Sequence, residues 1–99
     1  MEKGLTNISS ATTTTLVDFD SDIQVSKINI SNNNASNAVT IGLFKHDGTT
    51  SNDAYLIKNV VIPVGASLVL DDNVNVDTSV LSLKITTAGT SPDVSVMIE

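Results

Sequence analysis

Three aspartates at alternate positions form the most suggestive chemical pattern in the chain. Asp18, Asp20 and Asp22 give D-x-D-x-D, the spacing that opens an EF-hand calcium loop. The rest of that loop is missing, because Ile23 stands where glycine is required and Asn29 where the bidentate glutamate is required. The segment therefore predicts a solvated acidic turn, and weak calcium binding is the open alternative.

The other acidic residues and the histidine give little basis for catalysis. Asp71 and Asp72 are adjacent, and adjacent strand residues point to opposite faces, so we expect a turn there. Asp77 is the residue that would join them at a surface metal site. His46 is the only histidine, and no G-x-S-x-G elbow supports Ser–His–Asp catalysis through it. We expect a surface or interface histidine, with no catalytic, cofactor or metal site.

The charge balance argues against several classes of partner. The chain has eleven acidic residues against five lysines, no arginine, and a net charge of −6. Nucleic acid and anionic membranes are disfavoured, because both attract basic surfaces. The chain has no cysteine, which excludes disulfides and thiolate metal sites. No window approaches the length of apolar sequence that a membrane-spanning helix needs.

The dominant pattern is an alternation of apolar and short polar residues. Ser, Thr and Asn make up 34 of the 99 residues, and they alternate with Val, Ile and Leu along most of the chain. This period of two predicts half-buried β-strands. The expected strands are Ala11–Phe19, Ile23–Ile30, Ala38–Lys45, Ala54–Ile62, Ser67–Leu70, Val74–Val76, Val80–Thr87 and a last one through Val94, Val96 and Ile98.

Local irregularities in this pattern predict turns and a bulge. The alternation slips at Ser26–Lys27, which indicates a β-bulge. Ser31–Asn37 (SNNNASN) is expected to be a polar turn built on Asx-turns. In Ala54–Ile62, strict alternation would place Lys58 on the same face as Ile62.

Short strands separated by turn signals predict an all-β fold. We expect a jelly-roll-like antiparallel β-sandwich of about seven to eight strands. Residues 1–10 are expected to be an N-terminal arm, and residues 11–99 a single β-sandwich domain. The first residues, MEKGLTNISS, lack the apolar core of a signal peptide, so we expect the chain to stay in the cytoplasm of its producer unless it leaves as part of something larger.

The aromatic residues bear on a ligand-binding role. They are Phe19, Phe44 and Tyr55, and the last two fall opposite the main aliphatic rows of their strands. A carbohydrate- or receptor-binding module needs an aromatic-lined or concave patch. Exposure of Phe44 and Tyr55 side by side would favour that module, and burial of both would disfavour it.

Two long segments resemble small β-sandwich structural proteins of tailed bacteriophages. They are TTTTLVDFDSDIQVSKINISNNNASNAVTIGLFKHDG and AYLIKNVVIPVGASLVLDD. Shared pieces are the V-T-I-x-L strand at Val39–Leu43 and the K-N-V-x-I-P-x-G-x-S-L-x-L segment at Lys58–Leu70. The resemblance covers roughly residues 12–99. It lies in the texture of the sequence and in the order of its segments.

The resemblance implies a non-enzymatic virion component, most like capsid decoration (cement) proteins. It implies binding to the major capsid protein and to sister subunits, commonly as a homotrimer over three-fold or quasi-three-fold axes. The expected location is the capsid surface of a virion, after synthesis in the cytoplasm of a host bacterium. A neck, tail or fibre-tip protein is the alternative within the same family, and a carbohydrate- or receptor-binding module is the alternative outside it.

Overall fold

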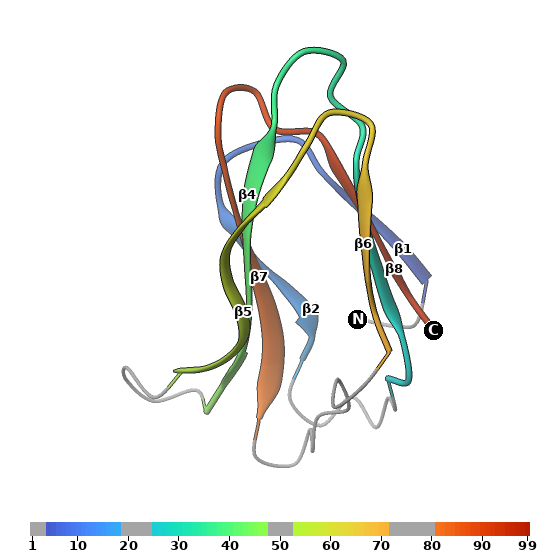
Figure 1. The fold of residues 1–99 in the computed structure, drawn as a ribbon. Coiled ribbons are helices and arrows are strands. Elements are labelled where there is room, and N and C mark those ends of the chain that lie inside the picture. The colour runs from blue at the N-terminus through green and yellow to red at the C-terminus, as the bar shows by residue number, and fades with distance from the viewer. Residues whose placement is uncertain (1–3, 19–24, 48–52, 72–80) are drawn as a thin grey trace.

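The described part of the chain forms eight β-strands. The computed structural model describes residues 4–18, 25–47, 53–71 and 81–99, and these residues contain no helix. The strands are β1 (Gly4–Ile8), β2 (Thr13–Val17), β3 (Ile28–Asn32), β4 (Val39–His46), β5 (Asp53–Ile62), β6 (Ser67–Leu70), β7 (Ser82–Ala88) and β8 (Val94–Ile98). The connections β1–β2, β3–β4, β5–β6 and β7–β8 lie at the same end of the molecule (Figure 1).

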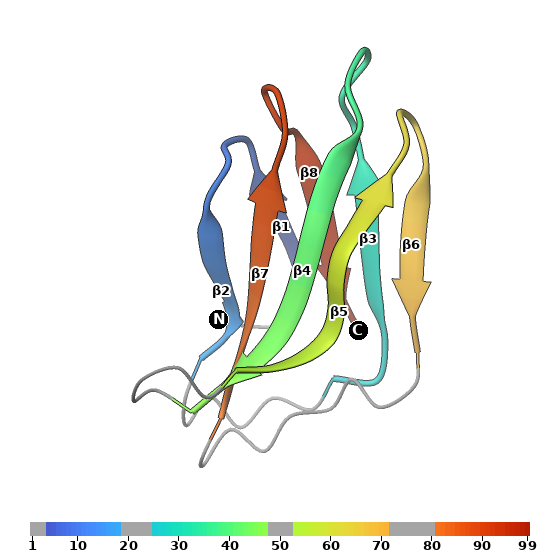
Figure 2. The same ribbon diagram turned by 60° about the vertical axis from the view of Figure 1, so that its left-hand side comes forward.

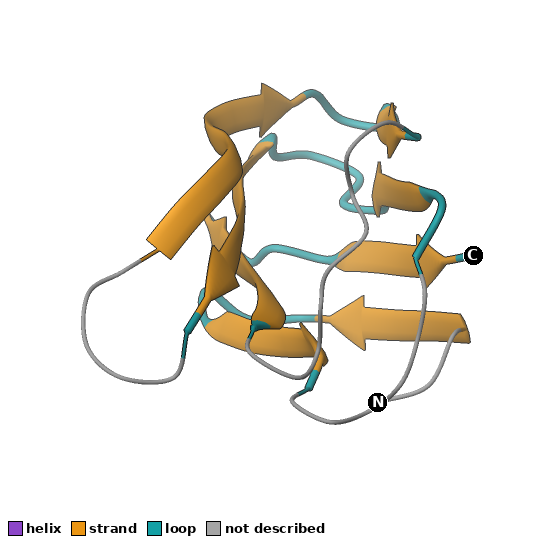
Figure 3. Ribbon diagram, turned by 90° about the horizontal axis from the view of Figure 1, so that it is seen from below, coloured by secondary structure: helices purple, strands orange, loops and turns teal. Residues whose placement is uncertain are grey.

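The strands form two antiparallel four-stranded sheets that pack face to face (Figure 3). Sheet A has the order β1-β8-β3-β6, and sheet B has the order β2-β7-β4-β5. The first strand pairs with the last, the second with the seventh, the third with the sixth, and the fourth with the fifth. This nested pairing is that of a jelly roll. The predicted fold class, an antiparallel β-sandwich, is therefore confirmed.

The core lies between the sheets and consists almost wholly of aliphatic side chains. Successive strand residues point to opposite faces, so the alternation in the sequence places one row of each strand inside. In sheet A the buried apolar residues are Ile8, Ile28, Ile30, Val94, Val96 and Ile98; in sheet B they include Leu16, Val17, Val39, Ile41, Leu43, Ile62, Leu83 and Ile85. Leu16 and Val17 are neighbours and both buried, because the pairing register of β2 shifts between Thr15 and Val17.

Two differences from the sequence prediction concern strands of sheet A. Residues Gly4–Ile8, which were expected to belong to an arm, form the edge strand β1 and pair with β8, and Ile8 is buried in the core. β3 begins at Ile28, later than expected. The predicted bulge explains the delay. The backbone N–H groups of Ser26 and Lys27 both donate to the carbonyl oxygen of Glu99, at 2.8 and 3.1 Å, so two residues oppose one. The predicted strand Val74–Val76 lies outside the described residues.

The predicted strict alternation along β5 is wrong. The register against β4 shifts twice, since Ile41 pairs with Val60, Leu43 with Ile57 and Phe44 with Tyr55. Asn59 sits in the first shift with a φ of 56°, a left-handed conformation that Asn tolerates better than most residues. Lys58 consequently lies over the Tyr55 ring instead of sharing a face with Ile62.

The side chain of a buried asparagine forms hydrogen bonds where the chain crosses between the two sheets. Asn32, at the end of β3, is only 2% exposed. Its Nδ2 donates to the carbonyl oxygens of Asn37 (3.0 Å), Ile62 (3.0 Å) and Pro63 (3.3 Å). Its Oδ1 accepts from the N–H of Asn34 at 2.9 Å, an Asx-turn. One side chain thus joins sheet A to the β3–β4 connection and to the end of β5 in sheet B.

The rest of the Asn-rich turn is held in the same way. The Oδ1 of Asn34 accepts from the N–H groups of Ser36 (2.7 Å) and Asn37 (2.9 Å). The Nδ2 of Asn34 donates to the carbonyl oxygen of Ser91 at 2.6 Å, which links this turn to the β7–β8 connection. The predicted Asx-turn chemistry of Ser31–Asn37 is therefore confirmed.

Removing the Asn32 amide should destabilise the whole sandwich. Asn32→Ala leaves buried carbonyl oxygens without their donor, and we expect the free energy of unfolding to fall by about 2–4 kcal/mol. Asn32→Asp should be at least as harmful, because it places a carboxylate against those carbonyl oxygens. Urea denaturation measures both effects.

Asn33→Ala is the matched control. Asn33 is an exposed neighbour whose Nδ2 donates to the Ser95 hydroxyl at 2.5 Å. Its replacement should change the free energy of unfolding by less than about 1 kcal/mol. Equal losses for Asn32→Ala and Asn33→Ala would contradict the role assigned to the buried amide.

Candidate functional site

The acidic residues singled out in the sequence do not assemble into a site within the described part of the chain. Asp18 follows β2 and Asp71 follows β6, and both are exposed. The other predicted candidates lie outside the described residues: Asp20, Asp22, Asp72 and Asp77. Among the residues that the structure describes, no group of three or more His, Asp or Glu side chains could hold a metal ion.

His46 takes part in a link between two strands. Its Nδ1 lies 2.5 Å from Oδ1 of Asp53, its register partner across β4 and β5. The side chains are 17% and 29% exposed, respectively. Ser82 is the partner of His46 on β7, and its hydroxyl donates at 3.4 Å to the backbone carbonyl of His46, not to the imidazole. The arrangement therefore ties the ends of three strands together.

Phe44 and Tyr55 lie together on the outer face of sheet B, and Phe19 lies outside the described residues. The rings of Phe44 and Tyr55 are 5.0 Å apart, and Lys58 Nζ lies 5.0 Å from the centroid of the Tyr55 ring. Tyr55 also covers Gly42, where an added Cβ would lie 3.4 Å from Cε2 of Tyr55 and 2.6 Å from Oγ1 of Thr86. Phe44 is only 5% exposed, whereas Tyr55 is 42% exposed. The cluster thus presents one half-open ring and no aromatic platform.

The two sheets differ sharply in charge. None of the residues in the four strands of sheet A is charged. The strands of sheet B carry Lys45, Lys58 and Lys84 together with Asp53. In a chain with a net charge of −6, an uncharged sheet is the more distinctive surface.

Cross-strand registers place three exposed apolar side chains in one row of sheet A. Leu5 pairs with Met97, Met97 with Asn29, and Asn29 with Val69, so the row crosses all four strands. Leu5 is 66% exposed, Met97 44% and Val69 47%. The residues that flank Met97 and Val69 on their strands face the core: Val96, Ile98, Leu68 and Leu70.

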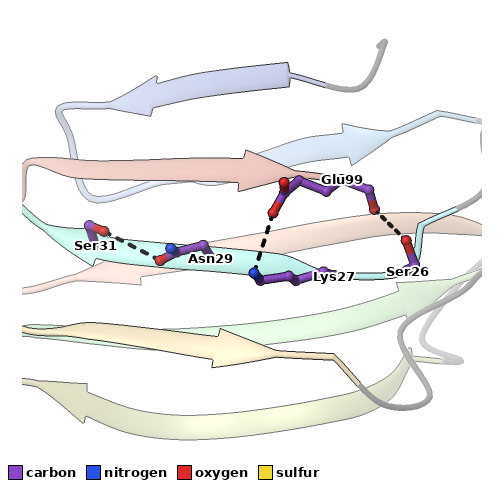
Figure 4. A network of polar contacts seen from close by, with 5 residues as sticks. All are labelled: Ser26, Lys27, Asn29, Ser31 and Glu99. Carbon is purple, nitrogen blue, oxygen red and sulfur yellow. Dashed lines mark hydrogen bonds and ion pairs between the residues drawn. The ribbon is translucent and has the colours of Figure 1, made fainter.

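A second row beside it is made of small polar side chains. By the same registers it runs through Asn7, Ser95, Ser31 and Ser67. Ser31 Oγ donates to Asn29 Oδ1 at 3.4 Å, which connects the two rows (Figure 4). We call these two rows, eight side chains on the outside of sheet A, the sheet A face.

Charges lie only around the ends of the sheet A face in the described structure. Lys27 and Glu99 form an ion pair at 3.6 Å where the bulge meets the end of β8 (Figure 4). Asp71 follows β6 at the same end, and Asp93 precedes β8 at the opposite end and accepts from Asn7 Nδ2 at 3.2 Å. An uncharged centre with exposed apolar groups and a charged rim is the anatomy of a protein–protein interface. The sheet A face can therefore be buried against another protein without placing an unpaired charge in the contact.

The sheet A face was not predicted from the sequence. The alternation places Met97 opposite the inward row of Val94, Val96 and Ile98, but Leu5 belonged to the predicted arm, and only the strand order brings Leu5, Met97 and Val69 into one row. The available signal was the absence of charge from the segments GLTNI, INISN, SLVL and VSVMI.

Comparison with known proteins adds no family to these observations: no protein-family model matches the chain, and no curated protein matches it. Within the described residues, no helix is long and apolar enough to cross a membrane.

The close approach at Gly42 gives a test of the aromatic cluster. Gly42→Ala forces the Thr86 side chain to move, and we expect it to lower the free energy of unfolding by about 1–3 kcal/mol. Adding Thr86→Ala, which removes the nearest atom, should restore most of that loss, while Thr86→Ala alone should have a small effect. Thermal or urea unfolding of the three variants measures the coupling. If the double variant lost as much stability as the two single variants together, the contact between position 42 and Thr86 would be contradicted.

Proposed function

We propose that this chain is a non-enzymatic structural protein of a tailed-bacteriophage virion, which decorates the capsid and stabilises the shell by binding the major capsid protein. The observation that carries the proposal is the sheet A face, with its apolar row and its lack of charge. Such a face can be buried against another protein without the several kcal/mol that desolvating an unpaired charge costs.

A repeated lattice suits a face of this kind. The exposed apolar groups are few, so a single contact through them is weak. Copies bound side by side on one particle, linked by contacts between sister subunits, gain from effective concentration and need no strong individual contact. Decoration from the outside also requires no reactive group.

The fold supports the proposal but does not carry it. Jelly rolls occur in viral capsid proteins, and also in lectins and enzymes, so this topology by itself leaves function open. The sequence resemblance to phage virion proteins points to the first of these uses. For the carbohydrate- or receptor-binding alternative, the two rings meet neither criterion, because Phe44 is buried and Tyr55 is 42% exposed.

Counting copies in purified particles tests the location. We expect hundreds of copies per particle, because a decoration protein covers the shell, after synthesis in the cytoplasm of a host bacterium. Quantitative mass spectrometry against the major capsid protein measures the ratio. Copies near six, twelve or eighteen would instead assign the chain to the neck or tail, since those assemblies follow lower rotational symmetries. Absence from particles would refute the virion role.

Two valines give a matched test of the sheet A face. Val69 is 47% exposed on sheet A, and Val61 is 57% exposed on β5 of sheet B. Val69→Lys should reduce binding to undecorated particles at least tenfold, because the lysine charge would be desolvated in the contact, and tenfold corresponds to about 1.4 kcal/mol. Val61→Lys should bind as the parent chain does. Cosedimentation with particles measures both, and equal binding by the two variants would contradict the assignment of the face.

A further inference from the structure

The edges of the sandwich are protected unequally. β1 and β6 form the edges of sheet A, and β2 and β5 those of sheet B. β1 and β2 lie on one side of the molecule, and β5 and β6 on the other (Figure 2). An edge strand exposes backbone N–H and C=O groups that can pair with another chain, and proteins usually block such pairing with bulges, charges, proline or very short strands.

Three of the four edges carry such a block. β5 has two register shifts, the left-handed Asn59 and an exposed Lys58, and Pro63 follows it. β2 has a register shift between Thr15 and Val17. β6, with four residues, is the shortest strand in the described part of the chain, and the exposed Asp71 follows it. β1 has no register shift, charge or proline between Gly4 and Ile8.

The backbone groups that β1 turns outward follow from the pairing of β8. Lys27 and Glu99 exchange both backbone hydrogen bonds, at 2.9 and 3.1 Å. Hydrogen-bonded and non-bonded pairs alternate along an antiparallel ladder, so Met97 and Ser95 also direct their N–H and C=O groups toward β3. The residues between them therefore direct theirs toward β1.

On β1 the same alternation separates inward from outward groups. Gly4, Thr6 and Ile8 are the partners of the β8 residues that face β1, so their backbone groups point toward β8. Leu5 and Asn7 lie between them, and their N–H and C=O groups point away from the sheet. These two residues are placed symmetrically about Thr6.

We propose that β1 pairs with β1 of a second copy of this chain, antiparallel and related by a two-fold axis through Thr6. Leu5 of each copy lies opposite Asn7 of the other, and each such pair exchanges both backbone hydrogen bonds. The pairing joins two four-stranded sheets into one continuous sheet and places two sheet A faces side by side. No charge in Gly4–Ile8 opposes the contact, although both copies are acidic overall.

We choose a second copy as the partner of this edge. The outward N–H and C=O groups of Leu5 and Asn7 are self-complementary under a two-fold axis, as an isologous contact requires. The pairing gives a dimer, not the trimer that the sequence resemblance implies. It depends only on the purified chain, so its success or failure is separate from that of shell binding.

Mass and amide exchange of the parent chain form the first test. Sedimentation equilibrium over a concentration series should show a reversible species of twice the chain mass of 10.4 kDa. Amide hydrogen exchange followed by NMR should slow at Leu5 and Asn7 as concentration rises, and should stay unchanged at Ser67 and Val69 on the opposite edge of sheet A. A monomer at all concentrations, a trimer, or exchange at Leu5 and Asn7 that does not depend on concentration would overturn the proposal.

Proline at an outward position forms the second test. Leu5→Pro removes an outward N–H and leaves the bonds to β8, so the dimer dissociation constant should rise at least tenfold. Val69→Pro is the matched control, because it removes an outward N–H from β6, and it should leave the dissociation constant unchanged. If either proline variant fails to fold, Leu5→Glu and Val69→Glu replace them, and only Leu5→Glu should weaken the dimer through like charges near the axis. Equal effects at the two edges would also overturn the proposal.

Discussion

The amide of Asn32 is the constraint on which the sandwich depends most directly. It is one of few buried polar side chains in the described structure, and it bonds at once to its own turn, to the β3–β4 connection and to the end of β5. Aliphatic packing between the sheets is non-directional and would tolerate small sliding of one layer over the other. Hydrogen bonds from one planar amide have fixed directions, so they set the position at which sheet A and sheet B meet. Thr87 also links two parts of the fold. Its hydroxyl donates to the carbonyl of Ser10 at 2.8 Å and joins β7 to the β1–β2 connection.

Strands with regular alternation could be predicted from the sequence, and the irregular ones could not. β6 has its predicted range, and β4 lies within one residue of its predicted range, because Val39, Ile41 and Leu43 mark one face of it without interruption. β1 escaped notice because GLTNI places one apolar residue outside and one inside, which resembles an arm more than a strand. The inward parity of β5 depends on the backbone conformation of Asn59, and residue spacing does not encode it. The sheet A face joins residues from both ends of the chain, so it required the strand order.

The asymmetry between the two sides of the molecule has one physical explanation. A two-layered sheet exposes four edges, each a template for unwanted pairing. Bulges in β5 and β2 twist those edges, and the lysines of sheet B keep its outer face solvated. Sheet A lacks both devices along β1 and on its outer face. The uncharged surface and the edge without a block against pairing therefore belong to the same sheet.

The position of β8 also shapes how the molecule is made. β8 is an inner strand of sheet A, between β1 and β3, so the first and third strands have no shared neighbour until β8 has been synthesised. Every ladder of sheet A except β3–β6 requires β8. Closure of sheet A therefore depends on pairing between β1 and β8, which are far apart in the sequence, and such long-range pairing slows folding. A nascent chain stalled before β8 would expose the uncharged strands β1 and β3 without their shared neighbour.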